Sequence, residues 1–131
     1  CKITDLSALA NVPNISWYSL QTGEHREQLK DAPSQMNILD LGKNFNDFSD
    51  TAAVMSQMDL IITIDTASAH LAGALGMKTW TMLPYAPDWR WFTHGELTPW
   101  YPTLRLFRQN RLDDWAPVIE QIRSELLKLK V

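Results

Sequence analysis

Residues able to bind or transfer a charged group are concentrated in one short stretch, residues 59–76. An apolar run ends there and small or hydroxyl-bearing residues open a predicted helix, in the order Asp65, Thr66, Ala67, Ser68 and, after one more alanine, His70. The start of a helix exposes unpaired backbone N–H groups and the positive end of the dipole, so phosphate binds there directly. The stretch is a candidate diphosphate site, with His70 as the candidate catalytic residue.

The same residues also have a simpler interpretation, and the local pattern does not separate the two. Asp65 or Thr66 would cap the helix in the ordinary way, and His70 would be a half-buried histidine without a chemical role. A hydrolytic triad of Asp65, Ser68 and His70 is disfavoured, because residues two apart on a helix point to nearly opposite sides. No Gly-x-Ser-x-Gly elbow exposes the serine either.

Motifs for metals and cofactors do not occur in the sequence. It contains no His-Glu-x-x-His, no Asp-x-Asp pair and no Gly-x-Gly-x-x-Gly after the first predicted strand. We therefore expect chemistry without a metal and without a cofactor.

Three residues outside this stretch are further candidates for ligand contact. Gln21 follows the first predicted strand and would hydrogen-bond to the ligand, unless it only begins a surface loop. Phe48 follows the second strand and would cradle a base, although an aromatic residue at this position is also ordinary core. Arg90 would neutralise phosphate or form a surface ion pair.

Arg90 lies in a long segment without periodicity, residues 84–102. Loops of that length are uncommon in a compact domain and often functional, and this one follows a strand, where an open α/β sheet places its ligands. The segment contains Trp89, Trp91 and Trp100. Their side chains would either stack on sugars or bases, or pack into the core and so pin the loop to it. Pinning is the favoured interpretation.

The elements around these residues alternate between strand and helix, as in βαβ units with a parallel sheet. Strands are predicted at residues 15–20, 38–41, 60–64 and 79–83, and a weaker one at 104–107. Helices are predicted at residues 24–30, 51–58 and 67–75, and from 113 or 114 to 129. Ser49 and Asp50 are the expected caps of the second helix, and Gly76 is the expected stop of the third. The predicted fold class is α/β, as a Rossmann-like three-layer α/β/α arrangement with a parallel sheet.

Composition is that of a folded chain with no general attraction to polyanions. Its 131 residues are 45% hydrophobic and 21% charged, so we expect one domain over residues 1–131. A net charge of -3 disfavours nucleic acid and anionic membranes as partners. No apolar run approaches the roughly 20 residues of a transmembrane helix. Cys1 is the only cysteine, which fits the reducing cytoplasm, our expected location.

The order of these segments resembles the donor-binding, C-terminal domain of GT-B glycosyltransferases of the heptosyltransferase family (glycosyltransferase family 9-like). The resemblance is carried by Asp65-Thr66, the small residues, the run His-Leu-Ala-Gly-Ala-Leu-Gly at 70–76, and a strand ending in Leu83-Pro84. Three further segments look most like bacterial relatives that follow tetratricopeptide repeats, namely Pro-Asp-Trp-Arg-Trp at 87–91, Pro-Trp-Tyr-Pro at 99–102 and Leu-Phe-Arg-Gln at 106–109.

This resemblance implies a hexosyl- or heptosyl-type transferase in which the chain binds a nucleotide-diphosphate sugar. Asp65 would contact sugar hydroxyls, Thr66 and the backbone of Ala67 the phosphates, and His70 the phosphate charge. Helix N–H groups and His70 would then stabilise the departing nucleotide diphosphate. Gln21 lies at a strand end that faces the nucleotide in similar proteins, and would hydrogen-bond to phosphate or ribose. Ala67 stands where the family has glycine, so a backbone angle reserved for glycine is excluded there.

The resemblance also implies that the chain is only part of the active site. We expect it to be a C-terminal fragment of a longer protein, whose N-terminal domain would bind the acceptor and supply the base. The fragment alone would then be inactive. The alternative is a noncatalytic Rossmann or flavodoxin-like binding or regulatory module.

Overall fold

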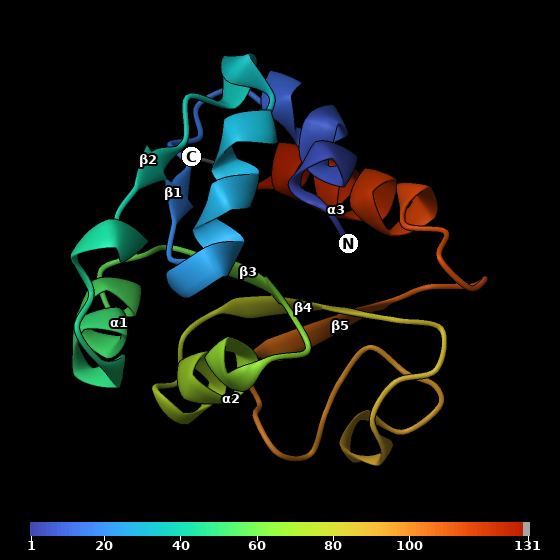
Figure 1. Ribbon diagram of the computed structural model, residues 1–131. Coiled ribbons are helices and arrows are strands. Elements are labelled where there is room, and N and C mark those ends of the chain that lie inside the picture. The colour runs from blue at the N-terminus through green and yellow to red at the C-terminus, as the bar shows by residue number, and fades with distance from the viewer. Residues whose placement is uncertain (130–131) are drawn as a thin grey trace. The chain divides into compact units, whose positions relative to one another are not determined.

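A computed structural model describes residues 1–129 of the chain, in which helices and parallel strands form an α/β structure with two small sheets (Figure 1). The chain divides into two compact units. One contains residues 1–51 and the chain from residue 115 onward, and the other contains residues 52–114. Within the described residues, no helix is both long and apolar enough to cross a membrane.

The first unit contains a two-stranded parallel sheet and several 3₁₀ helices. Strand β1 (Tyr18–Ser19) pairs with β2 (Leu39–Asp40), so both predicted strands are correctly placed but much shorter than expected. The 3₁₀ helices are η1 (Ile3–Asn11), η2 (Gly23–Asp31), η3 (Ser34–Met36) and η4 (Gly42–Asn44). Of these only η2 matches a predicted helix.

Helix α3 (Ala116–Lys128) belongs to the same unit and packs against η1. It begins slightly later than predicted and accommodates Pro117 in its first turn, where no backbone donor is required. Its buried apolar residues are Val118, Ile119, Ile122 and Leu126, and η1 contributes the buried Ile3 and Leu9. The apolar stripe of α3 is therefore buried together with an N-terminal segment that the sequence analysis left unassigned.

Helix α1 (Phe48–Met55) begins almost a turn earlier than predicted because Asp47 caps it. One carboxylate oxygen of Asp47 accepts the backbone N–H of Ser49 at 2.8 Å and that of Asp50 at 3.2 Å. The Asp50 carboxylate turns back to accept the backbone N–H of Asn46 at 2.7 Å. The prediction that Ser49 and Asp50 lie at the cap is therefore wrong, since both belong to the first turn.

Replacing Asp47 with alanine should lower the free energy of unfolding by about 1 kcal/mol, because two N–H groups of the first turn of α1 lose their acceptor. Urea denaturation followed by circular dichroism measures the change. The exposed Asp59 provides a control whose replacement with alanine should stay within about 0.5 kcal/mol of the parent. Equal effects of the two substitutions would contradict the cap.

The second unit is built on a three-stranded parallel sheet in the order β3-β4-β5. The strands are β3 (Ile61–Ile64), β4 (Thr79–Leu83) and β5 (Leu104–Arg108), which confirms all three predicted ranges to within one residue at each end. Every residue of the central strand β4 is buried, as parallel sheets require of strands that are covered on both faces. Because the strands are parallel, their carboxyl ends lie at one edge of the sheet.

Helix α2 (Ala67–Ala74) connects β3 to β4 and packs against both strands. It ends where predicted: Gly76 has φ 69°, and the N–H of Met77 bonds to the carbonyl of Ala72 at 3.0 Å. This is the left-handed glycine termination expected of a helix end. The start of α2 is thus placed at the carboxyl end of β3.

Candidate ligand-binding site

The start of α2 is not capped by a side chain. Thr66 has the extended backbone of an N-cap residue (φ −143°, ψ 174°), yet its hydroxyl makes no capping bond and instead lies 3.5 Å from the carbonyl oxygen of Ile64. The interpretation of the Thr66 side chain as an ordinary cap is therefore wrong. Thr66 and Ala67 are exposed, while Asp65 and Ser68 are half-buried. The first N–H groups of α2 are available to an external acceptor.

His70 lies one turn into α2, and aromatic side chains hold its ring on two sides. The Nδ1 atom lies 3.0 Å from the hydroxyl oxygen of Tyr101. The indole of Trp91 stacks on the imidazole with a centroid distance of 5.2 Å and an interplanar angle of 22°. The ring of His70 is therefore fixed in orientation, by two contacts that the sequence did not predict.

Tyr101 reaches His70 because Gly73 has no side chain. A Cβ atom at Gly73 would lie 2.5 Å from Cγ of the Tyr101 ring, far inside van der Waals contact. A glycine in a helix costs roughly 1 kcal/mol relative to alanine, so its presence inside α2 needs a reason. The close approach of Tyr101 supplies that reason.

The loop between β4 and β5, residues 84–103, is held by a buried tryptophan and a half-buried arginine. Trp91, within the single turn η5 (Trp89–Trp91), is fully buried in a cluster with Leu83, Leu104 and Leu106. The guanidinium of Arg108 donates to four carbonyl oxygens of the loop, those of Trp91, Phe92, His94 and Gly95. Partial burial lowers the pKa of Arg108 from its usual value. The long loop has little regular secondary structure, and its hydrogen bonds to the Arg108 guanidinium keep it ordered.

Beside His70 this loop forms a pocket of about 380 Å³, which we call the aromatic pocket; it is lined by His70, Trp89, Arg90, Trp100 and Tyr101. Trp89 is 72% exposed and Trp100 is 51% exposed. The predicted pinning to the core is confirmed for Trp91 and wrong for Trp89 and Trp100. Arg90 forms the surface ion pair that was one of its two interpretations, with Asp88 at 2.8 Å.

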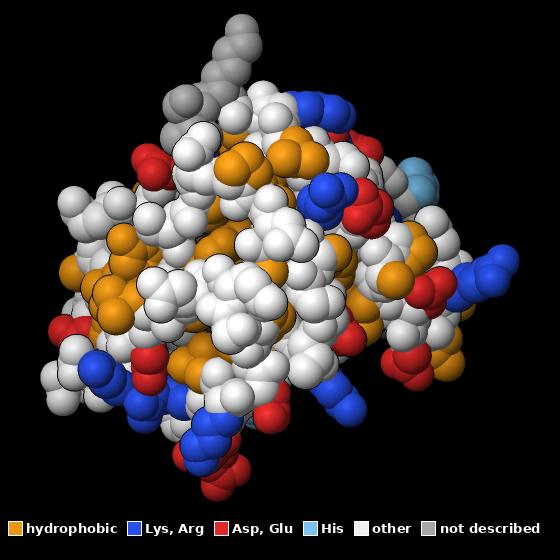
Figure 2. Space-filling model, turned by 90° about the horizontal axis from the view of Figure 1, so that it is seen from above, with side chains coloured by type: hydrophobic (Ala, Val, Ile, Leu, Met, Phe, Trp, Pro, Cys, Tyr) orange, Lys and Arg blue, Asp and Glu red, His pale blue; other side chains and the backbone are white. Residues whose placement is uncertain are grey.

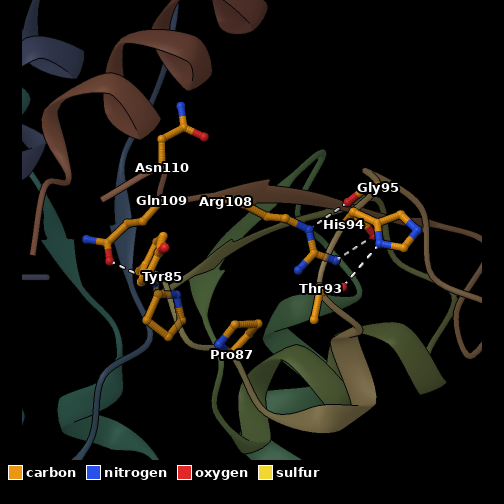
Figure 3. A pocket seen from close by; sticks show the side chains of 9 residues that line it. Tyr85, Pro87, Thr93, His94, Gly95, Arg108, Gln109 and Asn110 are labelled. Atoms are coloured by element: carbon orange, nitrogen blue, oxygen red, sulfur yellow. Dashed lines mark hydrogen bonds between the residues drawn. The ribbon is translucent and has the colours of Figure 1, made fainter. Parts of the chain in front are cut away.

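A second pocket of about 390 Å³ lies at the carboxyl ends of β4 and β5 (Figure 3). The side chain of Gln109 joins the two strand ends, because its Oε1 atom accepts the backbone N–H of Tyr85 at 3.0 Å. Its Nε2 atom is buried and has no hydrogen-bond partner among residues 1–129. Sequence reasoning missed Gln109, and its position two residues after the predicted strand 104–107 was the available signal.

Gln21 and Phe48 lie in the first unit, apart in sequence and unit from the other candidates. Gln21 follows β1 and is exposed, with its backbone N–H donating to the Ser19 hydroxyl at 3.3 Å. Phe48 is the first residue of α1 and is 61% exposed, so its interpretation as core is wrong. Their contacts to ribose and base stay predictions.

Charge around the molecule is mixed in sign. On the face shown in Figure 2, acidic and basic side chains of the described residues are interspersed, with no continuous basic surface. Residues 1–129 also contain no group of three or more His, Cys, Asp or Glu side chains placed to hold a metal ion. The polar groups that stand out are those at the start of α2 and in the two pockets.

The chain matches no protein-family model, and no curated protein or solved structure matches it significantly. Its function must therefore be argued from the residues themselves. The strongest arrangement is the uncapped start of α2, one turn before the immobilised ring of His70. Residues 65–68 line neither pocket, whereas His70 lines the aromatic pocket.

Proposed function

We propose that this chain is the donor-binding domain of a GT-B type glycosyltransferase, the Rossmann-like C-terminal half of that fold. It binds a nucleotide-diphosphate sugar and stabilises the leaving nucleotide without a metal. The observation that carries the proposal is the uncapped helix start at Thr66–Ser68, one turn before a histidine whose ring is held by Tyr101.

The phosphates of the donor account for the helix start. Backbone N–H groups at Ala67 and Ser68 lack a side-chain acceptor among the described residues, and an oxygen of the diphosphate would replace water there. The positive end of the α2 dipole adds an attraction for negative charge of roughly 0.3–1 kcal/mol. The neighbouring Asp65 carboxylate would accept hydrogen bonds from sugar hydroxyls.

Catalysis follows from where the negative charge develops. During transfer the bond between the anomeric carbon and the diphosphate oxygen breaks, and the acceptor hydroxyl forms the new bond after losing its proton to a base outside this chain. Charge grows on the diphosphate as it leaves. Donors that are already oriented stabilise that charge without reorganising, which is the role we assign to His70 and the first N–H groups of α2.

Replacing His70 with alanine in the full-length enzyme should lower the rate of transfer at saturating donor by more than about tenfold, since one oriented donor to the leaving group is lost. A coupled assay of nucleotide release measures the rate. His25, an exposed histidine of η2, is the matched control, and its alanine variant should keep the parent rate. Unchanged turnover in the His70 variant would exclude its catalytic role.

Binding of the nucleotide alone tests the proposal more directly. Isothermal titration of the chain with UDP, ADP and GDP should show saturable binding of at least one of them, weakened in the His70→Ala variant. A chain that binds none of the three is not a donor-binding domain. In that case the alternative of a noncatalytic binding or regulatory module takes its place.

A further inference from the structure

We infer that the aromatic pocket binds an uncharged pyranose ring, stacked on the exposed indoles and hydrogen-bonded at the polar rim. The inference deepens the proposed function and rests on it for the part that the sugar plays in transfer. Stacking itself requires no nucleotide, so the two can be tested apart.

The exposure of the two tryptophans is the first argument. Trp80 is 4% exposed and Trp91 is 0% exposed, so the second unit buries those indoles that pack in its core. Trp89 and Trp100 instead leave most or about half of their surface in water, beside a shallow, open hollow. Exposed aromatic surface that borders a concavity is typical of a binding site.

The wall of the pocket is held in place before any ligand arrives. The indole N–H of Trp100 donates to the carbonyl of Arg90 at 2.7 Å, which ties the end of the loop to the turn η5. That turn is capped by Asp88, whose carboxylate accepts the backbone N–H of Arg90 at 3.0 Å. Trp91 anchors the turn in the core. Because these groups are already ordered, a weakly held ligand such as a single sugar loses little to ordering the protein.

Charge at the pocket favours an uncharged ligand. The Arg90 guanidinium bonds to the Asp88 carboxylate at 2.8 Å, and its central carbon lies 5.0 Å from the centre of the Trp89 ring. The hydrogen bonds from the backbone N–H of Arg90 and from its guanidinium hold the pKa of Asp88 below its usual value. The carboxylate therefore stays ionised at neutral pH, and the cation of Arg90 is already balanced.

The remaining polar groups fit hydroxyls. Arg90 has more N–H donors than its bond to Asp88 uses, Tyr101 carries a hydroxyl, and His70 has a second ring nitrogen. A pyranose presents an apolar C–H face and an edge of neighbouring hydroxyls. Indole faces and a rim of planar donors match those two sides of the same ring.

The experiment titrates the full chain with the methyl glycosides of glucose, galactose, mannose and N-acetylglucosamine, followed by tryptophan fluorescence and calorimetry. At least one should bind saturably, and Trp89→Ala and Trp100→Ala should each weaken it by about tenfold, within the range of a lost stacking partner. Tyr85→Ala is the matched control, because Tyr85 is 58% exposed in the same loop but does not line the aromatic pocket. Circular dichroism confirms that each variant is folded.

Titrations with UDP, UDP-glucose, UDP-N-acetylglucosamine, ADP-glucose and GDP-mannose separate the sources of the sugar. If a nucleotide sugar binds better than its nucleotide and loses that advantage in Trp89→Ala, the pocket holds the donor's sugar. If the methyl glycoside still binds while the nucleotide sugar saturates the chain, it holds an acceptor sugar. Either result supports the inference.

Two outcomes would overturn the inference. One is that no glycoside binds, and the other is that only nucleotides bind and Trp89→Ala weakens them equally with and without their sugar, which makes the pocket a base site. Nucleotide binding in either case leaves the proposed function standing. If a glycoside binds and no nucleotide does, the aromatic pocket binds a sugar as inferred, but the donor-binding proposal fails.

Discussion

Replacing Arg108 with methionine should lower the free energy of unfolding by about 2–4 kcal/mol. Four loop carbonyls lose a charged donor, with Nε to the Gly95 oxygen at 2.8 Å and Nη1 to the Phe92 oxygen at 3.2 Å among the bonds removed. A hydrogen bond to a charged group contributes roughly 1.5–3 kcal/mol, and these share one cation and partly exposed acceptors, so the losses do not simply add. Methionine keeps the length of the aliphatic stem and removes only the donors.

Chemical denaturation monitored by tryptophan fluorescence measures this change, because Trp91 is a buried residue of the same loop. Arg108→Lys should recover little of the loss, since one ammonium group cannot reach four carbonyls arranged around a planar fork. Arg111→Met, at an exposed arginine just after β5, should stay within about 0.5 kcal/mol of the parent. A loss at Arg108 no larger than that at Arg111 would mean that the loop is ordered without the guanidinium.

Replacing Gly42 with alanine should destabilise the first unit by about 3 kcal/mol or more. A Cβ atom there would lie 1.8 Å from the carbonyl oxygen of Gln21 and 2.8 Å from its carbonyl carbon. Both are backbone atoms, so no side chain can rotate out of the way. The segment after β1 must move instead, which places this substitution at or above the upper end of the roughly 1–3 kcal/mol that overpacking costs.

Gly76→Ala provides a graded comparison for this substitution. Gly76 has φ 69° with nothing within 4 Å of the added Cβ, so only backbone strain of roughly 1 kcal/mol is expected. Thermal and urea denaturation of both variants should therefore rank Gly42 well above Gly76. The reverse order would show that the close approach at Gln21 relaxes at little cost.

The strands of the second unit were predictable because burial dictates their sequence. β4 is buried along its whole length, and its β-branched and apolar residues between Gly76 and Pro84 mark it clearly. β1 and β2 were overestimated, since among residues 1–129 each pairs only with the other and just two residues of each take part in the ladder. The apolar pattern indicates which residues favour the strand conformation. Hydrogen-bonded pairing with a neighbouring strand determines how many of those residues form a strand.

The helices of the first unit show a different limit. η2 was located but wound as a 3₁₀ helix, a distinction that side-chain pattern does not encode. η1 was missed because its buried Ile3 and Leu9 share a unit with α3, which begins more than a hundred residues later. The apolar face of η1 can be recognised as a buried face only when the position of α3 is known.

The candidate site also has one part that the sequence predicts and another part that it does not. Its local part, a strand ending before small residues and a histidine, can be read directly from residues 59–76. Its distant part cannot, because the bond from Tyr101 to His70 and the bonds from Arg108 to the loop depend on the path of a segment without periodicity. Gly73 was the one local sign of that packing, as a glycine inside a helix otherwise made of helix-forming residues.

The partner of His70 is a phenol, and this has a consequence for the protons of the site. A carboxylate only accepts hydrogen bonds, so it would force the histidine to carry its proton on the bonded nitrogen. The Tyr101 hydroxyl both donates and accepts, so its 3.0 Å bond to Nδ1 persists in either tautomer of the neutral ring. The other nitrogen can thus offer a proton to one ligand and a lone pair to the next, while the ring keeps its position.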